Sequence, residues 1–133
     1  MTPPCASAVH TAVVPAWARA GFSAKRPRMP LALGRSGRIV AIVFGHPLLS
    51  PPAKTRSNKI LWVAHPQPNG YTTLRITAQR MTGTKAVGKP VQRTVAGGPG
   101  PSIVDLPAPG CWRLTLRWAG RADQVDLAYA RRS

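Results

Sequence analysis

The chain has 133 residues with 19 Lys and Arg, three Asp and no Glu, so its formal net charge is +16 at pH 7. This length allows one domain at most, plus a tail, and no apolar run approaches the roughly 18–20 residues that a transmembrane helix needs. Glycosidases usually require a pair of carboxylates, and such an acid-poor chain is a poor source of them. The 15 Pro and 12 Gly favour turns and short strands over helices.

The first 36 residues have no clean hydrophobic period. They carry basic residues and prolines without any acid, most densely at residues 25–30. This composition predicts a flexible, disordered basic leader over residues 1–36; a short helix around residues 11–20 is the competing interpretation. The segment does not resemble a signal peptide, because it lacks a basic start and a proline interrupts its apolar patch. A misassigned translation start would explain such a leader equally well.

Two long apolar runs predict the first strands of the folded domain. Residues 38–45 form a continuous β-branched run, which is typical of a buried strand. Residues 59–65 are apolar on both faces, so we expect that strand to be central in its sheet. Between the two, Pro47, Pro51 and Pro52 predict a loop, because proline interrupts regular strand pairing.

Turn signals and alternation continue along the chain. The Asn-Gly pair in residues 66–70 predicts a turn, and an alternating strand follows at residues 72–80. A loop is predicted at residues 82–88. Short strands are then expected at residues 91–95, at a sheet edge behind a proline, and at residues 102–106.

The strongest pattern is the alternation in residues 110–129, which predicts a β-hairpin. The apolar side chains of its two strands share one face: Trp112, Leu114, Leu116, Trp118, Val125, Leu127 and Tyr129. If Trp118 lies opposite Asp123 across a four-residue turn, every further apolar residue meets an apolar partner. On the other face, Asp126 then lies diagonally between two arginines of the partner strand.

About seven strands, spaced by turn signals, predict a single all-β domain over residues 37–130. The expected architecture is an immunoglobulin-like, two-layer antiparallel β-sandwich. Because Cys5 lies in the predicted leader and Cys111 opens a strand, we expect no disulfide between them.

The segment Gly83–Lys89 has the spacing of a phosphate-binding loop, but it lacks the context that such a loop needs. The next residue should be Ser or Thr to hold magnesium, and here it is Pro90. The sequence that follows favours a strand and not the required helix. We therefore interpret the segment as a solvated hairpin loop.

Catalytic and metal-binding patterns are equally weak. Ser102, His65 and Asp105 supply the residue types of a catalytic triad, but no nucleophile-elbow motif accompanies them. The other histidines, His10 and His46, do not complete a metal-ligand spacing. We expect a protein that is not an enzyme and that has no metal and no cofactor.

Three arginines form the candidate site. Arg75, Arg113 and Arg117 occupy outward positions on predicted strands, and they would make a basic stripe if these strands lie in one sheet. Such a stripe is a candidate anion-binding surface; an ordinary solvated sheet face is the alternative. Three strand tryptophans could also form a stacking platform, although their spacing favours a place in the core.

Four segments carry a resemblance to known proteins: Val43–Leu48, Asn58–Val63, Pro101–Asp105 and Gly110–Arg113. Together they are similar to an uncharacterised group of actinobacterial proteins that resemble exported lipoproteins and that have an immunoglobulin-like domain. The resemblance implies a fold and a compartment, and no activity or catalytic residue. This chain departs from the group because it lacks a signal peptide with a lipidated cysteine.

From these features we expect a non-catalytic cell-envelope or secreted binding or structural module. Its partner would be a protein, a wall polymer or an anionic lipid. The alternative is a nucleic-acid-binding protein that acts through its high positive charge. The basic residues are spread along the chain, which favours nonspecific attraction to polyanions at low salt.

Overall fold

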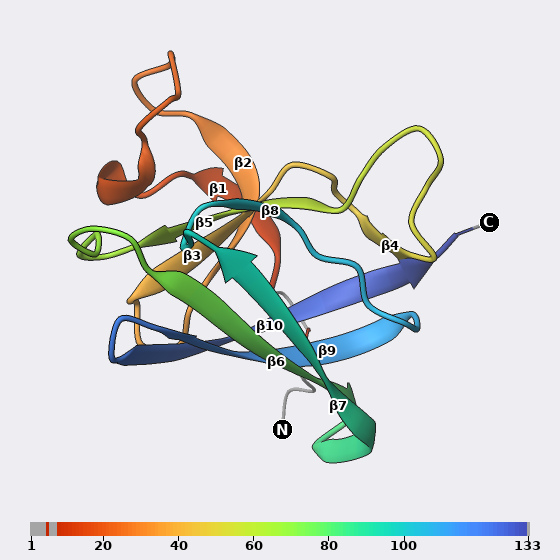
Figure 1. Ribbon diagram of the computed structural model, residues 1–133. Helices are drawn as coiled ribbons and strands as arrows, with labels where there is room; N and C mark the ends of the chain where they lie inside the picture. Colours follow the sequence, from red (N-terminus) through yellow and green to blue (C-terminus); the bar gives the residue numbers. More distant parts are fainter. Residues whose placement is uncertain (1–4, 6–7, 133) are drawn as a thin grey trace.

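The computed structural model describes Cys5 and residues 8–132, and the strands in this part of the chain form an all-β fold (Figure 1). The described elements, in chain order, are β1 (His10–Val13), the short 3₁₀ helix η1 (Ala16–Ala18), β2 (Arg28–Leu33), β3 (Ile39–Val43), β4 (Leu48–Ser50), β5 (Lys59–Ala64), β6 (Thr73–Thr82), β7 (Lys85–Ala96), β8 (Pro101–Ile103), β9 (Gly110–Trp118) and β10 (Arg121–Arg131). No helix in the described residues is long and apolar enough to cross a membrane.

The strands form two sheets of five strands each. The first sheet has the order β1-β2-β3-β5-β8, and the second has the order β4-β10-β9-β6-β7. Neighbouring strands are antiparallel apart from β4, which runs parallel to the end of β10. The core between the sheets contains side chains of both, among them Trp62 of β5, Ile76 of β6 and Leu114 of β9. The fold is therefore a two-layer sandwich.

The first sheet is buried on both faces at β3 and along most of β5. All five residues of β3 are buried, because alternate side chains face the central core and a second apolar cluster. Val40 and Ile42 belong to this second cluster, together with Val14, Ala18 and Leu31. The segment between β1 and β2 thus covers the outer face of the sheet, which explains why strands β3 and β5 are apolar on both sides.

The flexible leader predicted for residues 1–36 does not hold for residues 8–33. Here β1 and β2 pair antiparallel, with His10 opposite Leu31 and Val13 opposite Arg28. The competing helix at residues 11–20 is also wrong, because only the three residues of η1 are helical. The apolar residues of this segment follow no regular period, so their burial was not visible in the pattern. Residues 1–4, 6 and 7, which the prediction also covered, lie outside the described part of the chain.

Ten strands are described where about seven were predicted. The additional strands are β1, β2 and β4; the last lies within the proline-rich loop, and its three residues fit between Pro47 and Pro51. The strand predicted at residues 59–65 is internal in its sheet, since β5 lies between β3 and β8, while β3 occupies the centre. The predicted edge position of β7 is confirmed, although this strand begins at Lys85 and replaces most of the expected loop.

The C-terminal hairpin is confirmed, and its register differs from the predicted one by two residues. Leu114 pairs with Val125, and Trp118 pairs with Arg121. The turn contains only Ala119 and Gly120, whose φ angles of 47° and 74° suit the positive values of a two-residue hairpin turn. A shift of two residues keeps every side chain on its face, so the predicted apolar face is buried as expected.

Asp123 fastens the two layers together at one end. It is only 6% exposed, and its carboxylate accepts hydrogen bonds from the backbone N–H groups of Ser36 (2.9 Å), Arg38 (2.9 Å) and Gln124 (2.8 Å). The loop between β2 and β3 is thereby held against β10. Gly34 is required in this loop, because a Cβ atom at that position would overlap the carboxylate of Asp123.

Two buried hydroxyl groups hold the connection between β8 and β9. Tyr129 donates a hydrogen bond to the carbonyl of Val104 (2.6 Å), and Ser50 donates one to the carbonyl of Leu106 (2.7 Å). Burial raises the pKa of the Tyr129 hydroxyl above its ordinary value, since the charged form would lose its hydration. Both bonds satisfy backbone carbonyls in an irregular segment next to the core.

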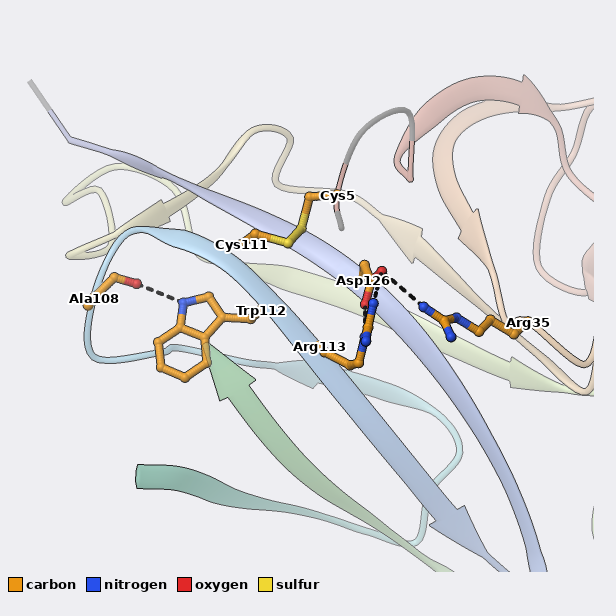
Figure 2. Close-up of a disulfide and its surroundings, with 7 residues drawn as sticks. All are labelled: Cys5, Arg35, Ala108, Cys111, Trp112, Arg113 and Asp126. Atoms are coloured by element: carbon orange, nitrogen blue, oxygen red, sulfur yellow. Dashed lines mark hydrogen bonds and ion pairs between the residues drawn. A yellow bond between two sulfur atoms is a disulfide. The ribbon is translucent and has the colours of Figure 1, made fainter. Parts of the chain in front are cut away.

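A disulfide joins Cys5 to Cys111, contrary to the expectation that these cysteines stay apart (Figure 2). The two Cα atoms are 5.7 Å apart although 106 positions separate the residues in sequence. Val9 packs against the central core, and β1 begins at the next residue. The expectation was wrong because it rested on a flexible leader.

We expect Gly34→Ala to lower the free energy of unfolding by about 1–3 kcal/mol, the usual cost of forcing an atom into a filled space. Gly100→Ala is the matched control, because a Cβ atom there meets nothing within 4 Å, and it should change stability by less than about 0.5 kcal/mol. Urea unfolding followed by tryptophan fluorescence measures both. Equal stabilities of the two variants would contradict the role of the contact between Gly34 and Asp123.

Candidate anion-binding surface

The three predicted arginines lie on neighbouring strands of the second sheet. Arg75 is on β6, and Arg113 and Arg117 are on β9. These strands pair directly, with Arg75 opposite Arg117 and Gln79 opposite Arg113. The condition for a basic stripe is therefore met: all three residues occupy outward positions, between buried residues that face the core.

The structure separates Arg113 from the other two. Its guanidinium donates to the carboxylate of Asp126, with Nε–Oδ1 at 3.0 Å and Nη2–Oδ2 at 3.3 Å. Arg35 of the β2–β3 loop approaches the same carboxylate at 3.6 Å (Figure 2). The hydrogen bond to Asp126 raises the pKa of Arg113. This arginine is thus largely neutralised within the protein.

Arg75 and Arg117 remain as an exposed pair of like charges. They are direct cross-strand partners, and both are exposed. Within the described residues the ion pairs involve only the carboxylate of Asp126, so neither of these two arginines has an acidic partner there. Like charges directly opposite each other destabilise a sheet, and a bound anion would relieve the repulsion.

A shallow depression of about 420 Å³ lies at this end of the sheet. Its lining includes Arg75, Arg117, Arg121, Thr73 and the two-residue turn at positions 119–120. The tight turn is what brings Arg121 next to the pair, since it places Arg121 opposite Trp118. We call these residues the basic depression.

Sequence analysis missed Arg121 because the predicted four-residue turn placed it in a loop. The Ala-Gly pair at positions 119–120 was the signal for a shorter turn. A fourth guanidinium adjoins the depression from the loop between β2 and β3: Arg38 donates to the carbonyl of Ala122 (3.2 Å), and Ala122 is a lining residue. The local charge is therefore larger than the three predicted arginines suggested.

Trp118 also lines the depression. Its side chain is only 2% exposed, and its indole N–H has no hydrogen-bond partner among the described residues. The indoles of the other two strand tryptophans differ, because Trp62 donates to Ser102 (3.0 Å) and Trp112 to the carbonyl of Ala108 (2.9 Å). All three tryptophans belong to the core and do not form an exposed stacking platform.

The three carboxylates of the chain all have structural partners. Asp123 and Asp126 hold the contacts described above, and Asp105 accepts a hydrogen bond from the side-chain amide of Asn58 (2.8 Å). Of the residues considered for a catalytic triad, Ser102 bonds Trp62 and the carbonyl of Ile60. His65 stacks instead on Trp17, with ring centroids 4.9 Å apart.

The remaining motifs form neither a metal site nor a phosphate-binding loop in the described residues. No group of three potential metal ligands occurs there. The segment with phosphate-loop spacing lies in the turn between β6 and β7 and in β7 itself, where Thr82 pairs with Lys85. It therefore precedes no helix, as the hairpin interpretation predicted.

We expect a double-mutant cycle between Arg75→Gln and Arg117→Gln to show a repulsive coupling of about 0.2–1 kcal/mol at low salt. Either single change relieves the repulsion, so the second change should add less stability than the first. The coupling should disappear at 1 M NaCl, where the Debye length is about 3 Å. The control cycle pairs Arg117→Gln with Lys25→Gln, which lies on the cover of the other sheet. A coupling no larger than in the control would contradict the paired arrangement.

Comparisons with protein-family models, with curated proteins and with solved structures gave no match to this chain. The function proposed below therefore rests on the geometry and the charges of this protein.

Proposed function

We propose that this protein is a non-catalytic binding module of the cell envelope, or a secreted one, that holds an anionic partner at its basic depression. The observation that carries the proposal is the exposed Arg75–Arg117 pair, which lies cross-strand without an acidic partner in the described residues. Such a pair costs stability in the free protein. A partner that supplies negative charge offsets this cost.

The charge balance of the whole chain supports an anionic partner. The net charge is +16, and the three Asp are engaged in contacts that fasten loops and strands. Surplus positive charge of this size attracts polyanions and speeds their encounter with the protein. An anionic wall polymer or an anionic lipid fits this requirement, whereas a catalytic role would need acid–base groups that are not already bound elsewhere.

The Cys5–Cys111 disulfide supports a place outside the cytoplasm. Disulfides persist in oxidising compartments and are rare in the cytosol. This one links the segment before β1 to β9 of the second sheet, so it is part of the folded architecture. It agrees with the resemblance to exported actinobacterial proteins suggested by the sequence.

We also propose that the sandwich is immunoglobulin-like. In that fold, strands A, B and E share one sheet and strands C, F and G share the other. The order β3-β5-β8 corresponds to A-B-E, and β6, β9 and β10 correspond to C, F and G. In this assignment β1 and β2 extend the first sheet beyond strand A.

Binding measured at two salt concentrations tests the function. We expect the protein to bind lipid-free cell walls or phosphatidylglycerol vesicles at 200 mM NaCl, and Arg75→Gln/Arg117→Gln to weaken that binding by about tenfold. Lys25→Gln/Arg26→Gln removes the same charge from the other layer and should have little effect. Duplex DNA is the competing ligand, and a contact with 6–10 phosphates loses about 10³–10⁵ in affinity between 50 and 200 mM salt. Tight DNA binding at 200 mM, without wall or vesicle binding, would replace our proposal with the nucleic-acid alternative.

Thiol labelling tests the compartment. In protein recovered from its source cells under denaturing conditions with a thiol-alkylating reagent present, we expect Cys5 and Cys111 to stay unlabelled until a reductant is added. Mass spectrometry of the two cysteine-containing peptides measures this directly. Full labelling without reductant would show that the cysteines are free in the cell and would contradict an oxidising compartment.

A further inference from the structure

The basic depression brings together three guanidinium groups. Its ligand must therefore carry enough negative charge and enough acceptor oxygens to match them. Arg75, Arg117 and Arg121 line one open space of about 420 Å³, and Thr73 adds a residue with a hydroxyl group. None of the three arginines has an ion-pair partner among the described residues. A ligand here meets the three charges of these arginines, and the guanidinium of Arg38 adjoins them at Ala122.

Guanidinium groups are selective in what they bind well. Each offers five N–H donors in a planar fork, which matches carboxylate and phosphate oxygens in pairs. A carboxylate carries one charge and two oxygens, and one arginine satisfies both of them. A phosphodiester likewise has one charge and two free oxygens. A phosphomonoester has three free oxygens and a charge of about −1.5 to −2 at pH 7.

The arrangement of the forks favours the last of these groups. Arg75 and Arg117 are directly opposite each other on adjacent strands, within reach of one anion for two long, exposed side chains. Arg121 approaches from the end of the hairpin. A phosphomonoester, with three free oxygens and nearly two negative charges, matches these three arginines better than a carboxylate or a phosphodiester, each with two oxygens and one charge. Because the depression is open to solvent, the rest of the ligand can extend away from the protein.

We propose that the basic depression binds a terminal phosphoryl group, a phosphomonoester, and prefers it to a phosphodiester. This inference rests on the proposed function and names the ligand chemistry of the same site. The phosphoryl group sits between Arg75 and Arg117, and Arg121 contributes the third charge. A lipid headgroup and the phosphorylated end of a polymer present the same chemistry.

The test compares glycerol 3-phosphate with glycerophosphoglycerol, its diester counterpart, at 150 mM NaCl. We expect the monoester to bind about tenfold more tightly. Its binding should shift the indole N–H resonance of Trp118, which lines the depression, more than those of Trp62 and Trp112; Trp118→Phe assigns the peak. Equal affinities for the two compounds would overturn the inference.

Two sets of variants separate recognition from charge. Arg75→Lys/Arg117→Lys keeps both charges but removes the forks, so it should lose most of the preference for the monoester. Lys25→Gln/Arg26→Gln should keep that preference within about twofold, the scatter expected of distant, independent sites. An unchanged preference in the double lysine variant would overturn the inference, because charge alone would then suffice.

Vesicle binding distinguishes a lipid headgroup from a soluble or polymer-borne phosphoryl group. It also separates the proposed monoester preference from the proposed function. If the protein binds phosphatidic acid vesicles more strongly than phosphatidylglycerol vesicles of equal surface potential, the phosphoryl group belongs to a lipid. If it binds both vesicles equally and retains its affinity for glycerol 3-phosphate, the phosphoryl group belongs to a soluble molecule or a polymer. Wall or vesicle binding that depends on Arg75 and Arg117 but shows no monoester preference would overturn this inference and leave the proposed function intact. Failure to bind any of these anions would overturn both.

Discussion

The burial of β3 and of most of β5 on both faces is the constraint on which the rest of this structure depends. Strands β3 and β5 are apolar on both faces, and leaving either face in water would expose several β-branched side chains at about 25 cal/mol per Å² of apolar area. One face packs on the second sheet, and the other is covered by the segment that contains Val14, Ala18 and Leu31. On the second sheet, Arg75 and Arg117 are exposed at outward positions of β6 and β9. The candidate binding surface therefore lies on the face of these strands that points away from the core.

The small number of carboxylates shapes the surface as strongly as the core does. The chain has only three Asp, so each Asp that braces a loop is one fewer to neutralise an arginine. Asp126 pairs with Arg113 and approaches Arg35. The carboxylate of Asp123 accepts hydrogen bonds from three backbone N–H groups instead. Among the described residues, the arginines at the far end of the sheet therefore have no ion-pair partner. The same few carboxylates therefore brace the fold and determine which arginines of the second sheet are paired.

The sequence predicted those parts of the fold that depend on local periodicity. The alternation from Trp112 to Tyr129 was enough to identify the hairpin and its buried face, because a side-chain period of two survives a register error of two. The register itself depended on the length of the turn, and Arg121 was missed for that reason. The cover over the first sheet could not be predicted from its own irregular spacing. It could have been inferred from its effect, since a strand that is apolar on both faces needs two partners. The sequence predicted that Arg75 and Arg117 would lie together only if their strands belonged to one sheet. Strand order depends on contacts between distant parts of the chain, so the local pattern could not decide this.

The link between Cys5 and Cys111 has a consequence for biosynthesis. Cys5 leaves the ribosome before its partner, which follows after 105 further residues. At about 5–20 residues per second, the first thiol waits several seconds or more before the second one exists. Oxidation of this pair can only follow the emergence of β9. A cell that makes this protein must keep the first thiol from pairing with other molecules during that interval.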